Sequence, residues 1–289
     1  MTMPSEDSTT AIFSEPALQA AFEADGFVVV TLLDQGEADA LAEAYAATVE
    51  PPRRGFQATL LTADAERRAA VDTIVRSVVG APLKRLLPDF RLCFCTFVAK
   101  AARSATSSVP LHQDWSFVDE SRHTSIGLWC PLVDVTADNG CLQVVAGSHK
   151  LPSAPRGVST PFAYPELLPA LRRGLLRALP LHAGQAVLLH PRLFHGSPPN
   201  RSASVRVVAG GVLIPECARL RYYHVSDPAR PHVLDAFEVD DGFYLRHTPG
   251  HRPEAATHLG TIEARVPKID PCTLTALLTS GPLGLSSPT

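Results

Sequence analysis

The sequence has 289 residues, a formal net charge of −3, 45% hydrophobic residues and 19% charged residues. This length and composition suit one domain with a large core, and the small net charge excludes the basic excess typical of nucleic-acid-binding proteins. Residues 1–10 lack the basic and apolar regions of a signal peptide, and no apolar run is long enough to cross a bilayer. We therefore expect a soluble, cytoplasmic protein that acts on a small molecule, not on nucleic acid or a membrane.

The first part of the chain predicts a helix followed by a strand. Residues 1–15 are rich in Ser, Thr and Glu and are expected to be disordered, and a single domain is expected over 16–279. Helical spacing begins at Leu18 and ends at Asp25-Gly26, where glycine can adopt the left-handed conformation that stops a helix. The β-branched run 27–30 predicts a short buried strand.

Two further helices are predicted before the chain changes character. Asp34 and Glu37 form a capping-box signature, and apolar residues follow at helical spacing. A second amphipathic helix is predicted from about Asp64 to Val79-Gly80. Both patterns are typical of helices that flank a sheet and do not themselves carry chemistry.

After Pro88 the chain consists of short β-type segments separated by turn residues, which indicate a sandwich or barrel. The predicted strands are 90–99, 125–132, 141–145, 185–190 and 205–214. Asn139-Gly140 predicts a tight turn, because this pair supplies positive backbone angles. The proline-rich segment 150–180, with a helix-like patch from Leu167 to Leu179, is the longest candidate insertion, and such loops often cover active sites. The tail 280–289 is expected to be disordered.

The six cysteines are too sparse for a disulfide scaffold, so we expect reduced thiols. Cys93 and Cys95 could form half of a zinc site, but no second pair of ligands occurs at a matching spacing. Packing as small apolar side chains is the interpretation we favour.

His112, Asp114 and His195 are the candidate metal ligands. Residues two apart in an extended strand project to the same side, so His112 and Asp114 can reach one ion. His195 follows an apolar strand, at a position expected near a barrel mouth. Two imidazoles and one carboxylate with open positions suit a non-haem Fe(II) centre that uses oxygen. The His-x-Asp spacing alone is also typical of a hydrogen-bonded surface pair, and His190 competes with His195 for the third position.

A keto-acid cosubstrate would also need a cationic anchor, and the planar fork of arginine binds a carboxylate with two hydrogen bonds. Arg206 lies at the start of the strand that follows His195, so it would enter the same cavity if the two strands are antiparallel neighbours. Arg201 is the rival candidate, but it falls in a turn where exposure is expected. Ser197, on the same side as His195, could add a hydroxyl donor.

Five stretches occur in order between about residues 18 and 215, and together they resemble the phytanoyl-CoA dioxygenase family of Fe(II)/2-oxoglutarate oxygenases. They are 25–30 (DGFVVV), 112–114 (HQD), 129–135 (WCPLVDV) with 139–144 (NGCLQV), 147–150 (GSHK), and 195–197 (HGS) with 200–202 (NRS) and Arg206.

The resemblance implies a mainly β protein with flanking helices, a double-stranded β-helix (jelly roll, cupin-like) whose core spans about 88–215. It implies Fe(II), 2-oxoglutarate as cosubstrate and O2. The residues that it places in the site are the iron ligands His112, Asp114 and His195, the 2-oxoglutarate anchor Arg206, the neighbouring aromatic Trp129 and the hydroxyl partner Ser197.

Two positions refine the resemblance. Lys100 falls in a strand where relatives often carry a basic residue that contacts the cosubstrate, but Ala101 replaces the proline that follows in many of them, so the role of Lys100 stays open. Asp114 is intact, whereas halogenating relatives have Ala or Gly there, which indicates a hydroxylase-type oxygenase.

We therefore expect a 2-oxoglutarate-dependent dioxygenase that hydroxylates, or otherwise oxidises an unactivated C–H bond of, a small metabolite and releases succinate and CO2. An amino acid or a biosynthetic intermediate is the favoured substrate, and an acyl thioester stays open. Substrate contacts are expected from Trp115, Phe117 and the 150–180 insertion, with contributions from 216–250.

Two other classes of protein are compatible with the same residues. A redox-inert, metal-binding cupin-like isomerase or hydrolase would not consume 2-oxoglutarate. A binding module whose triad has lost its role is the second alternative, and the retained Arg206 argues against it. Arg156, Arg172 and Arg173 could attract an anionic group, although arginines on such a segment are typically solvated.

Overall fold

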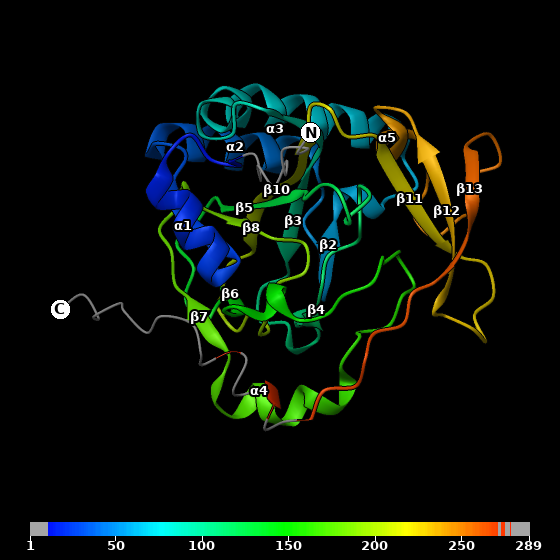
Figure 1. Ribbon diagram of the computed structural model, residues 1–289. Helices are drawn as coiled ribbons and strands as arrows, with labels where there is room; N and C mark the ends of the chain where they lie inside the picture. Colours follow the sequence, from blue (N-terminus) through cyan, green and yellow to red (C-terminus); the bar gives the residue numbers. More distant parts are fainter. Residues whose placement is uncertain (1–10, 271–272, 275–277, 279–289) are drawn as a thin grey trace.

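Two antiparallel sheets form the centre of the computed structural model, which describes residues 11–270, 273–274 and 278. The larger sheet has the strand order β1-β8-β5-β10-β3-β2, and the smaller has the order β4-β9-β6-β7 (Figure 1). The larger sheet contains β1 (Phe27–Thr31), β2 (Phe56–Ala58), β3 (Phe90–Lys100), β5 (Ile126–Pro131), β8 (Gln185–Leu189) and β10 (Arg206–Pro215). The smaller contains β4 (Val109–His112), β6 (Leu142–Val145), β7 (Arg177–Leu179) and β9 (Phe194–Ser197).

This arrangement is the jelly roll that the sequence predicts, since strands distant in sequence alternate within each sheet. Side chains from both sheets meet in a shared core, where Val144 of β6 packs in one cluster with Val187 and Leu189 of β8. The predicted strands correspond to β1, β3, β5, β6, β8 and β10. The turn predicted at Asn139-Gly140 is also present, and Gly140 has φ +84°.

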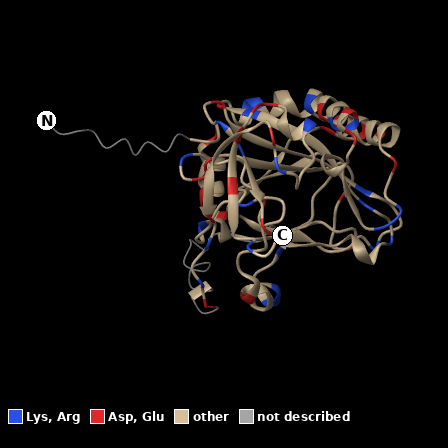
Figure 2. Cartoon of the chain, turned by 90° about the vertical axis from the view of Figure 1, so that its right-hand side faces the viewer, with Lys and Arg blue, Asp and Glu red and all other residues tan. Residues whose placement is uncertain are grey.

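Figure 2 shows acidic and basic residues along the helices at the top of the molecule. Three helices pack against the larger sheet: the second and third lie side by side above it, and the first lies lower, beside its β1 edge (Figure 1). They are α1 (Pro16–Asp25), α2 (Gln35–Thr48) and α3 (Ala65–Leu86). The helix α1 ends at Gly26 with φ +81°, and Asp34 and Glu37 form the predicted capping box at the start of α2. The helix α3 continues beyond the predicted end at Gly80, because the buried spacing of Val79 and Leu83 carries its apolar side one turn further.

The start of the chain, which was expected to be disordered through residue 15, is described from residue 11. Phe13 is 3% exposed and its ring lies 5.2 Å from that of Phe22 on α1, so this apolar side chain anchors the segment to the core. Residues 1–10 and the expected disordered tail 280–289 lie outside the described residues. None of the described helices combines the length and apolar character needed to cross a bilayer.

The 150–180 insertion does not cover the interior of the jelly roll, contrary to the expectation from the sequence. It contains the short helices η4 (Pro165–Leu167) and α4 (Leu168–Gly174) before β7. Leu171 and Tyr164 of the insertion pack with Phe194 and Val145 of the smaller sheet. The next residue on each strand, His195 and Val144, points the other way, into the interior. Since successive strand side chains alternate between faces, the insertion covers the outer face of the smaller sheet.

A third sheet follows the jelly roll in a region where the sequence predicted no strands. It contains β11 (Leu220–Val225), β12 (Val233–Val239) and β13 (Thr257–Glu263) in that order, with the short helix α5 (Phe243–Arg246) between β12 and β13. Tyr244 of α5 packs against Phe117 at 5.1 Å and against Phe94 of β3 at 5.6 Å between ring centroids. The sheet therefore supports one wall of the jelly-roll interior.

Candidate active site

Strand pairing brings the three candidate metal ligands together. His112 at the end of β4 lies directly opposite His195 of β9, and Asp114 follows two residues after β4. One ligand atom from each of the three residues lies within 4.8 Å of the other two. The Nε2 atoms of His112 and His195 are 3.8 Å and 3.5 Å from Oδ1 of Asp114. This convergence offers a cation two nitrogen donors and one oxygen donor.

Both imidazoles are held in the orientation that metal binding requires. Nδ1 of His112 lies 2.9 Å from the carbonyl oxygen of Pro110, and Nδ1 of His195 lies 2.9 Å from that of Leu193. A carbonyl oxygen only accepts hydrogen bonds, so each ring carries its proton on Nδ1 and presents the Nε2 lone pair to the centre. The backbone N–H of Asp114 donates to the carbonyl of Pro191 at 2.9 Å.

The electrostatics of the three side chains also suit a cation. Burial and the neighbouring His195 lower the pKa of His112 to about 4, which keeps this imidazole neutral. Burial opposes ionisation of Asp114, but the charge of His195 and its hydrogen bond outweigh that effect and hold the pKa of the carboxyl below its usual range. Asp114 in turn raises the pKa of His195 against the opposing effect of burial. A divalent cation would supply the positive charge beside Asp114 that protonation of His195 at Nε2 otherwise provides.

The rival candidates lie elsewhere. Nδ1 of His190 accepts a hydrogen bond from the backbone N–H of Arg192 at 3.1 Å, and the His190 ring stacks on Phe22. Among the described residues no second group of metal-ligating side chains forms, so Cys93 and Cys95 are not part of a metal cluster there. Both thiols are buried. Arg201 is exposed in its turn, as the sequence predicts.

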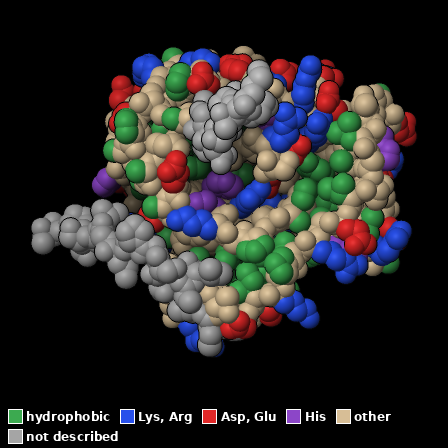
Figure 3. All heavy atoms as spheres, viewed as in Figure 1, with side chains coloured by type: hydrophobic (Ala, Val, Ile, Leu, Met, Phe, Trp, Pro, Cys, Tyr) green, Lys and Arg blue, Asp and Glu red, His purple; other side chains and the backbone are tan. Residues whose placement is uncertain are grey.

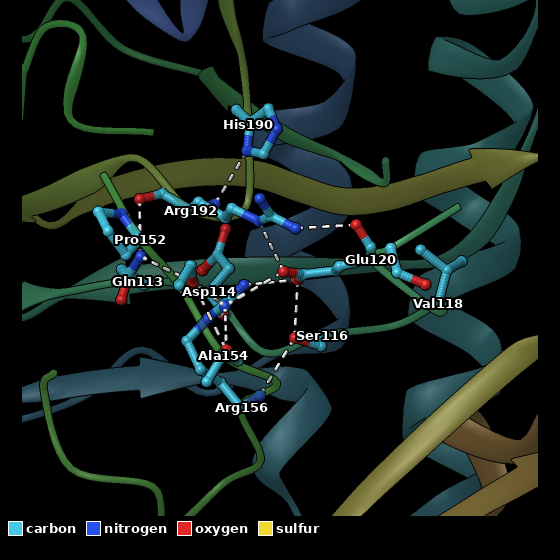
Figure 4. Close-up of polar contacts among 12 residues, drawn as sticks. Gln113, Asp114, Ser116, Val118, Glu120, Pro152, Ala154, Arg156, His190 and Arg192 are labelled. Atoms are coloured by element: carbon cyan, nitrogen blue, oxygen red, sulfur yellow. Dashed lines mark hydrogen bonds and ion pairs between the residues drawn. The ribbon is translucent and has the colours of Figure 1, made fainter. Parts of the chain in front are cut away.

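A buried ionic network fixes the backbone of the metal-binding segment (Figure 4). Glu120 has a side chain only 6% exposed and binds Arg156 at 2.5 Å and Arg192 at 2.9 Å. Arg156 also donates from Nε to the carbonyl oxygen of Asp114 at 2.7 Å, and Ser116 donates to Glu120 at 2.7 Å. The expected anion-attracting role of Arg156 is therefore not supported, because its charge is already paired with Glu120.

No sequence feature points to Glu120, because the charged stretch 119–123 is typical of a solvated loop. No sequence feature points to Gly127 on β5 either, although this glycine leaves room for Asp114. A Cβ at this position would lie 3.2 Å from Oδ2 of Asp114 and 3.1 Å from Cγ of Leu189. A larger residue at position 127 would therefore displace the Asp114 carboxylate or the Leu189 side chain.

Two buried cations lie beside one another deeper in the fold. Arg206 on β10 is opposite Lys100 on β3, and the two side chains are 1% and 0% exposed. Nε and Nη1 of Arg206 have no hydrogen-bond partner, and the guanidinium carbon lies 5.4 Å from the ring centroid of Trp129. Lys100 donates from Nζ to the carbonyl oxygens of Ser197 and Pro198.

The charges of these two cations are unbalanced. Burial lowers the pKa of Arg206 to about 10, and burial together with Arg206 lowers that of Lys100 to about 7. Unpaired guanidinium donors inside a protein are costly, and a carboxylate bound through two oxygens is the partner that their geometry suits. These residues therefore fit one end of a dicarboxylate. For such a site the sequence and the family resemblance predict Arg206, Trp129 and Ser197, and they leave the role of Lys100 open.

A cavity of about 300 Å³ extends from the three ligands to the surface. The cavity is lined by Trp115, Phe117 and residues of β2, β3, β5 and β10. Leu60 and Leu61 of the short helix η1 (Thr59–Leu61) also line it. Trp115 and Phe117, which were expected to contact the substrate, line this cavity. The segments 150–180 and 216–250 were also expected to contribute, but none of the described residues that line the cavity comes from them. The face drawn in Figure 3 is hollowed near its centre, and acidic and basic side chains are interspersed around the hollow.

A family model described as phytanoyl-CoA dioxygenase (PhyH) matches residues 22–208. Among curated proteins, a phytanoyl-CoA dioxygenase from Arabidopsis thaliana is 32% identical over 97 residues, which are 33% of this chain and 34% of that protein. A probable phytanoyl-CoA dioxygenase from Caenorhabditis elegans is 30% identical over 147 residues, or 46% of this chain and 44% of that protein. The matches thus span between about a third and a half of these relatives.

Two solved structures share the fold. The epimerase SnoN from nogalamycin biosynthesis, in complex with Fe3+, alpha ketoglutarate and nogalamycin RO, is 25% identical with a TM-score of 0.51, covering 84% of this chain and 98% of that one. HygX from Streptomyces hygroscopicus, with nickel, 2-oxoglutarate and hygromycin B bound, is 18% identical with a TM-score of 0.50, covering 70% and 88%.

The ionic network predicts a link between Glu120 and metal binding. Glu120→Ala would leave Arg156 buried with an unbalanced charge, so we expect a loss of about 3 kcal/mol in the free energy of unfolding and a metal affinity about tenfold weaker. Urea unfolding and Mn(II) titration measure the two effects. Glu238→Ala, which removes the more exposed partner of Arg221, is the control and should cost less than about 1 kcal/mol. Unchanged metal affinity in both Glu120→Ala and Glu120→Gln would show that the network does not position Asp114.

Proposed function

Because the chain belongs to the phytanoyl-CoA dioxygenase family, we propose that it is an Fe(II)- and 2-oxoglutarate-dependent oxygenase that hydroxylates an unactivated C–H bond of a small organic molecule. Its cofactors are Fe(II) and 2-oxoglutarate, in keeping with the family and with the donor set of the triad. The observation that carries the proposal is the pairing of a three-ligand centre with buried, unsatisfied guanidinium donors beside it. O2 and substrate C–H would yield C–OH, while 2-oxoglutarate yields succinate and CO2.

Each residue has a distinct part in this proposal. His112, Asp114 and His195 would hold the iron from one side and leave the other side open to 2-oxoglutarate and oxygen. Arg206 would bind the far carboxylate of 2-oxoglutarate through one edge of its guanidinium group, whose Nε and Nη1 lack partners within the protein. When bound, iron supplies the activation of oxygen that is coupled to decarboxylation of the cosubstrate.

The remaining residues would shape the cosubstrate site. Trp129 would form one wall, since the Arg206 guanidinium already lies over its ring. Ser197 on β9 would add a hydroxyl donor to the same carboxylate. Lys100 would supply a second positive charge, and its hydrogen bond to the Ser197 carbonyl joins β3 to the strand of His195. The walls of the cavity would keep water away from the reacting carbon.

Epimerisation is the second candidate, because the structural relative SnoN is described as an epimerase and is 25% identical to this chain. Product mass separates the two outcomes, since hydroxylation adds one oxygen atom and epimerisation leaves the mass unchanged. The intact Asp114 favours an oxygenase over a halogenase. A redox-inert isomerase or hydrolase of the same fold would form no succinate, and succinate release across a panel of candidate metabolites tests this directly.

Arg206 offers a test of cosubstrate binding that does not depend on turnover. Arg206→Met removes the bidentate donors but keeps an apolar side chain of comparable length, so 2-oxoglutarate affinity should fall by at least about a hundredfold, equivalent to about 3 kcal/mol. Calorimetric titration of the Mn(II)-loaded protein measures it. Arg201→Met, in the exposed turn, should leave the affinity unchanged. Equal affinities in wild type and Arg206→Met would contradict the assignment of the anchor.

The lowered pKa of Lys100 predicts how cosubstrate binding depends on pH. In the empty site this pKa is about 7, and a bound carboxylate favours the charged ammonium form. Binding above this pKa therefore takes up a proton, so 2-oxoglutarate affinity should fall as pH rises, by about tenfold between pH 6.5 and 8.5. Titrations of the Mn(II)-loaded protein across this range would show the decline in wild type and a flatter profile in Lys100→Met. Identical slopes in the two proteins would contradict a role for Lys100 in binding.

A further inference from the structure

We propose that the substrate of this site is an uncharged molecule that places an apolar ring system, alicyclic or aromatic, in the cavity beside the metal centre. The inference rests on the proposed oxygenase function and names the class of molecule that this chain oxidises. Such a substrate differs from the amino acid that was expected from the sequence, because the lining of the cavity offers no partner for a charged group.

The charged side chains in and near the cavity are those assigned to the metal and the cosubstrate. Among the described lining residues the only titratable side chains are His112, Asp114 and His195, the proposed metal ligands. Lys100 and Arg206 lie outside this lining, at the proposed cosubstrate site. The remaining lining is aliphatic, aromatic or glycine except for one threonine. A carboxylate or ammonium group placed here would lose its hydration without gaining a partner, which is strongly unfavourable.

The single threonine turns its polar atom away from the substrate space. The hydroxyl of Thr96 lies 2.9 Å from that of Thr59 and accepts a hydrogen bond from the backbone N–H of Leu60 at 3.0 Å. Its hydrogen-bonding capacity is thereby used within the protein, and its Cγ2 methyl lies 3.4 Å from where a Cβ on Gly210 would stand. The floor of the cavity around Gly210 is therefore apolar.

The wall of the cavity at Gly210, called its floor here, has a shape that suits a ring. Gly210 lies opposite Thr96 on one neighbouring strand and opposite Trp129 on the other. It has no side chain to fill the space between them, and an added Cβ would meet no atom closer than 3.4 Å. Trp115 and Phe117, with ring centroids 6.2 Å apart, line the same cavity. Aromatic walls over a flat glycine floor favour contact with the face of a ring.

Two exposed apolar side chains lie at the mouth of the cavity. Only four large hydrophobic side chains are exposed among the described residues, and two of them, Phe56 at 39% and Leu61 at 50%, belong to the cavity. Exposed apolar residues gathered at the mouth of a pocket are typical of a ligand-binding surface. An uncharged ring compound larger than the cavity would extend over these two residues.

Binding of a neutral fluorescent probe to the full-length, metal-free protein tests the proposal. N-phenyl-1-naphthylamine, whose emission rises in apolar surroundings, should bind the wild type. Its affinity should fall at least about tenfold in Gly210→Val, because the new side chain occupies the floor, and in Leu61→Glu, because a charge then stands at the rim. Gly80→Val is the matched control on α3, where an added Cβ meets no atom within 4 Å, and it should bind the probe as the wild type does. Leu61→Glu lies at an exposed position, so it remains informative if Gly210→Val fails to fold.

A matched pair of competitors then tests the charge of the substrate. Tetralin should displace the probe at a concentration at least about tenfold lower than 1,2,3,4-tetrahydronaphthalene-2-carboxylate does, since the two differ in one carboxylate. Equal or better displacement by the carboxylate, or unchanged probe affinity in both cavity variants, would overturn the proposal. The assay contains no iron, 2-oxoglutarate or turnover. A failure of the oxygenase proposal would instead appear as absent cosubstrate binding with the probe results intact.

Discussion

The pairing of β4 with β9 is the constraint on which the rest of the site depends. It sets His112 directly opposite His195 although the two residues are more than eighty positions apart in the sequence. A slip of either strand by one residue would turn its own imidazole to the outer face and away from the other. That outer face is already filled by the 150–180 insertion through Phe194 and Val145. The packing of the insertion thus holds the ligands inward without touching the cavity.

The buried charged groups form two clusters that differ in whether the positive charge has an acidic partner. Glu120 binds two arginines within the protein, and one of them, Arg156, donates a hydrogen bond to the backbone carbonyl of Asp114. Around Arg206 and Lys100 the positive charge is left without an acidic partner, which destabilises the empty protein but prepares it for a dianion. The substrate cavity between them carries no such groups beyond the metal ligands. In the proposed function these three regions would serve metal, cosubstrate and substrate, with Trp129 shared by the last two.

Local signals in the sequence were sufficient for the elements that depend on local chemistry. The glycine at residue 26, the capping box at Asp34 and the strand patterns after Pro88 each specify backbone conformation directly, and the structure has them. The His-x-Asp spacing also predicted that His112 and Asp114 can reach one ion, although β4 ends at His112 and Asp114 lies two residues beyond it. The positions that sequence reasoning missed depend on contacts between distant segments: Glu120 looks solvated until two arginines from other loops reach it, and the insertion has no sequence feature that says which face it covers.

Anaerobic titration of the protein with Fe(II) and 2-oxoglutarate tests the central claim most directly, because it requires the metal ligands and the cosubstrate anchor to act on one centre. Chelation of iron by the keto and carboxylate oxygens of 2-oxoglutarate gives a weak visible charge-transfer band. The account predicts that this band appears in the wild type with one equivalent of each component and is absent from His195→Ala. A wild-type protein that binds Fe(II) but develops no band on addition of 2-oxoglutarate would contradict it.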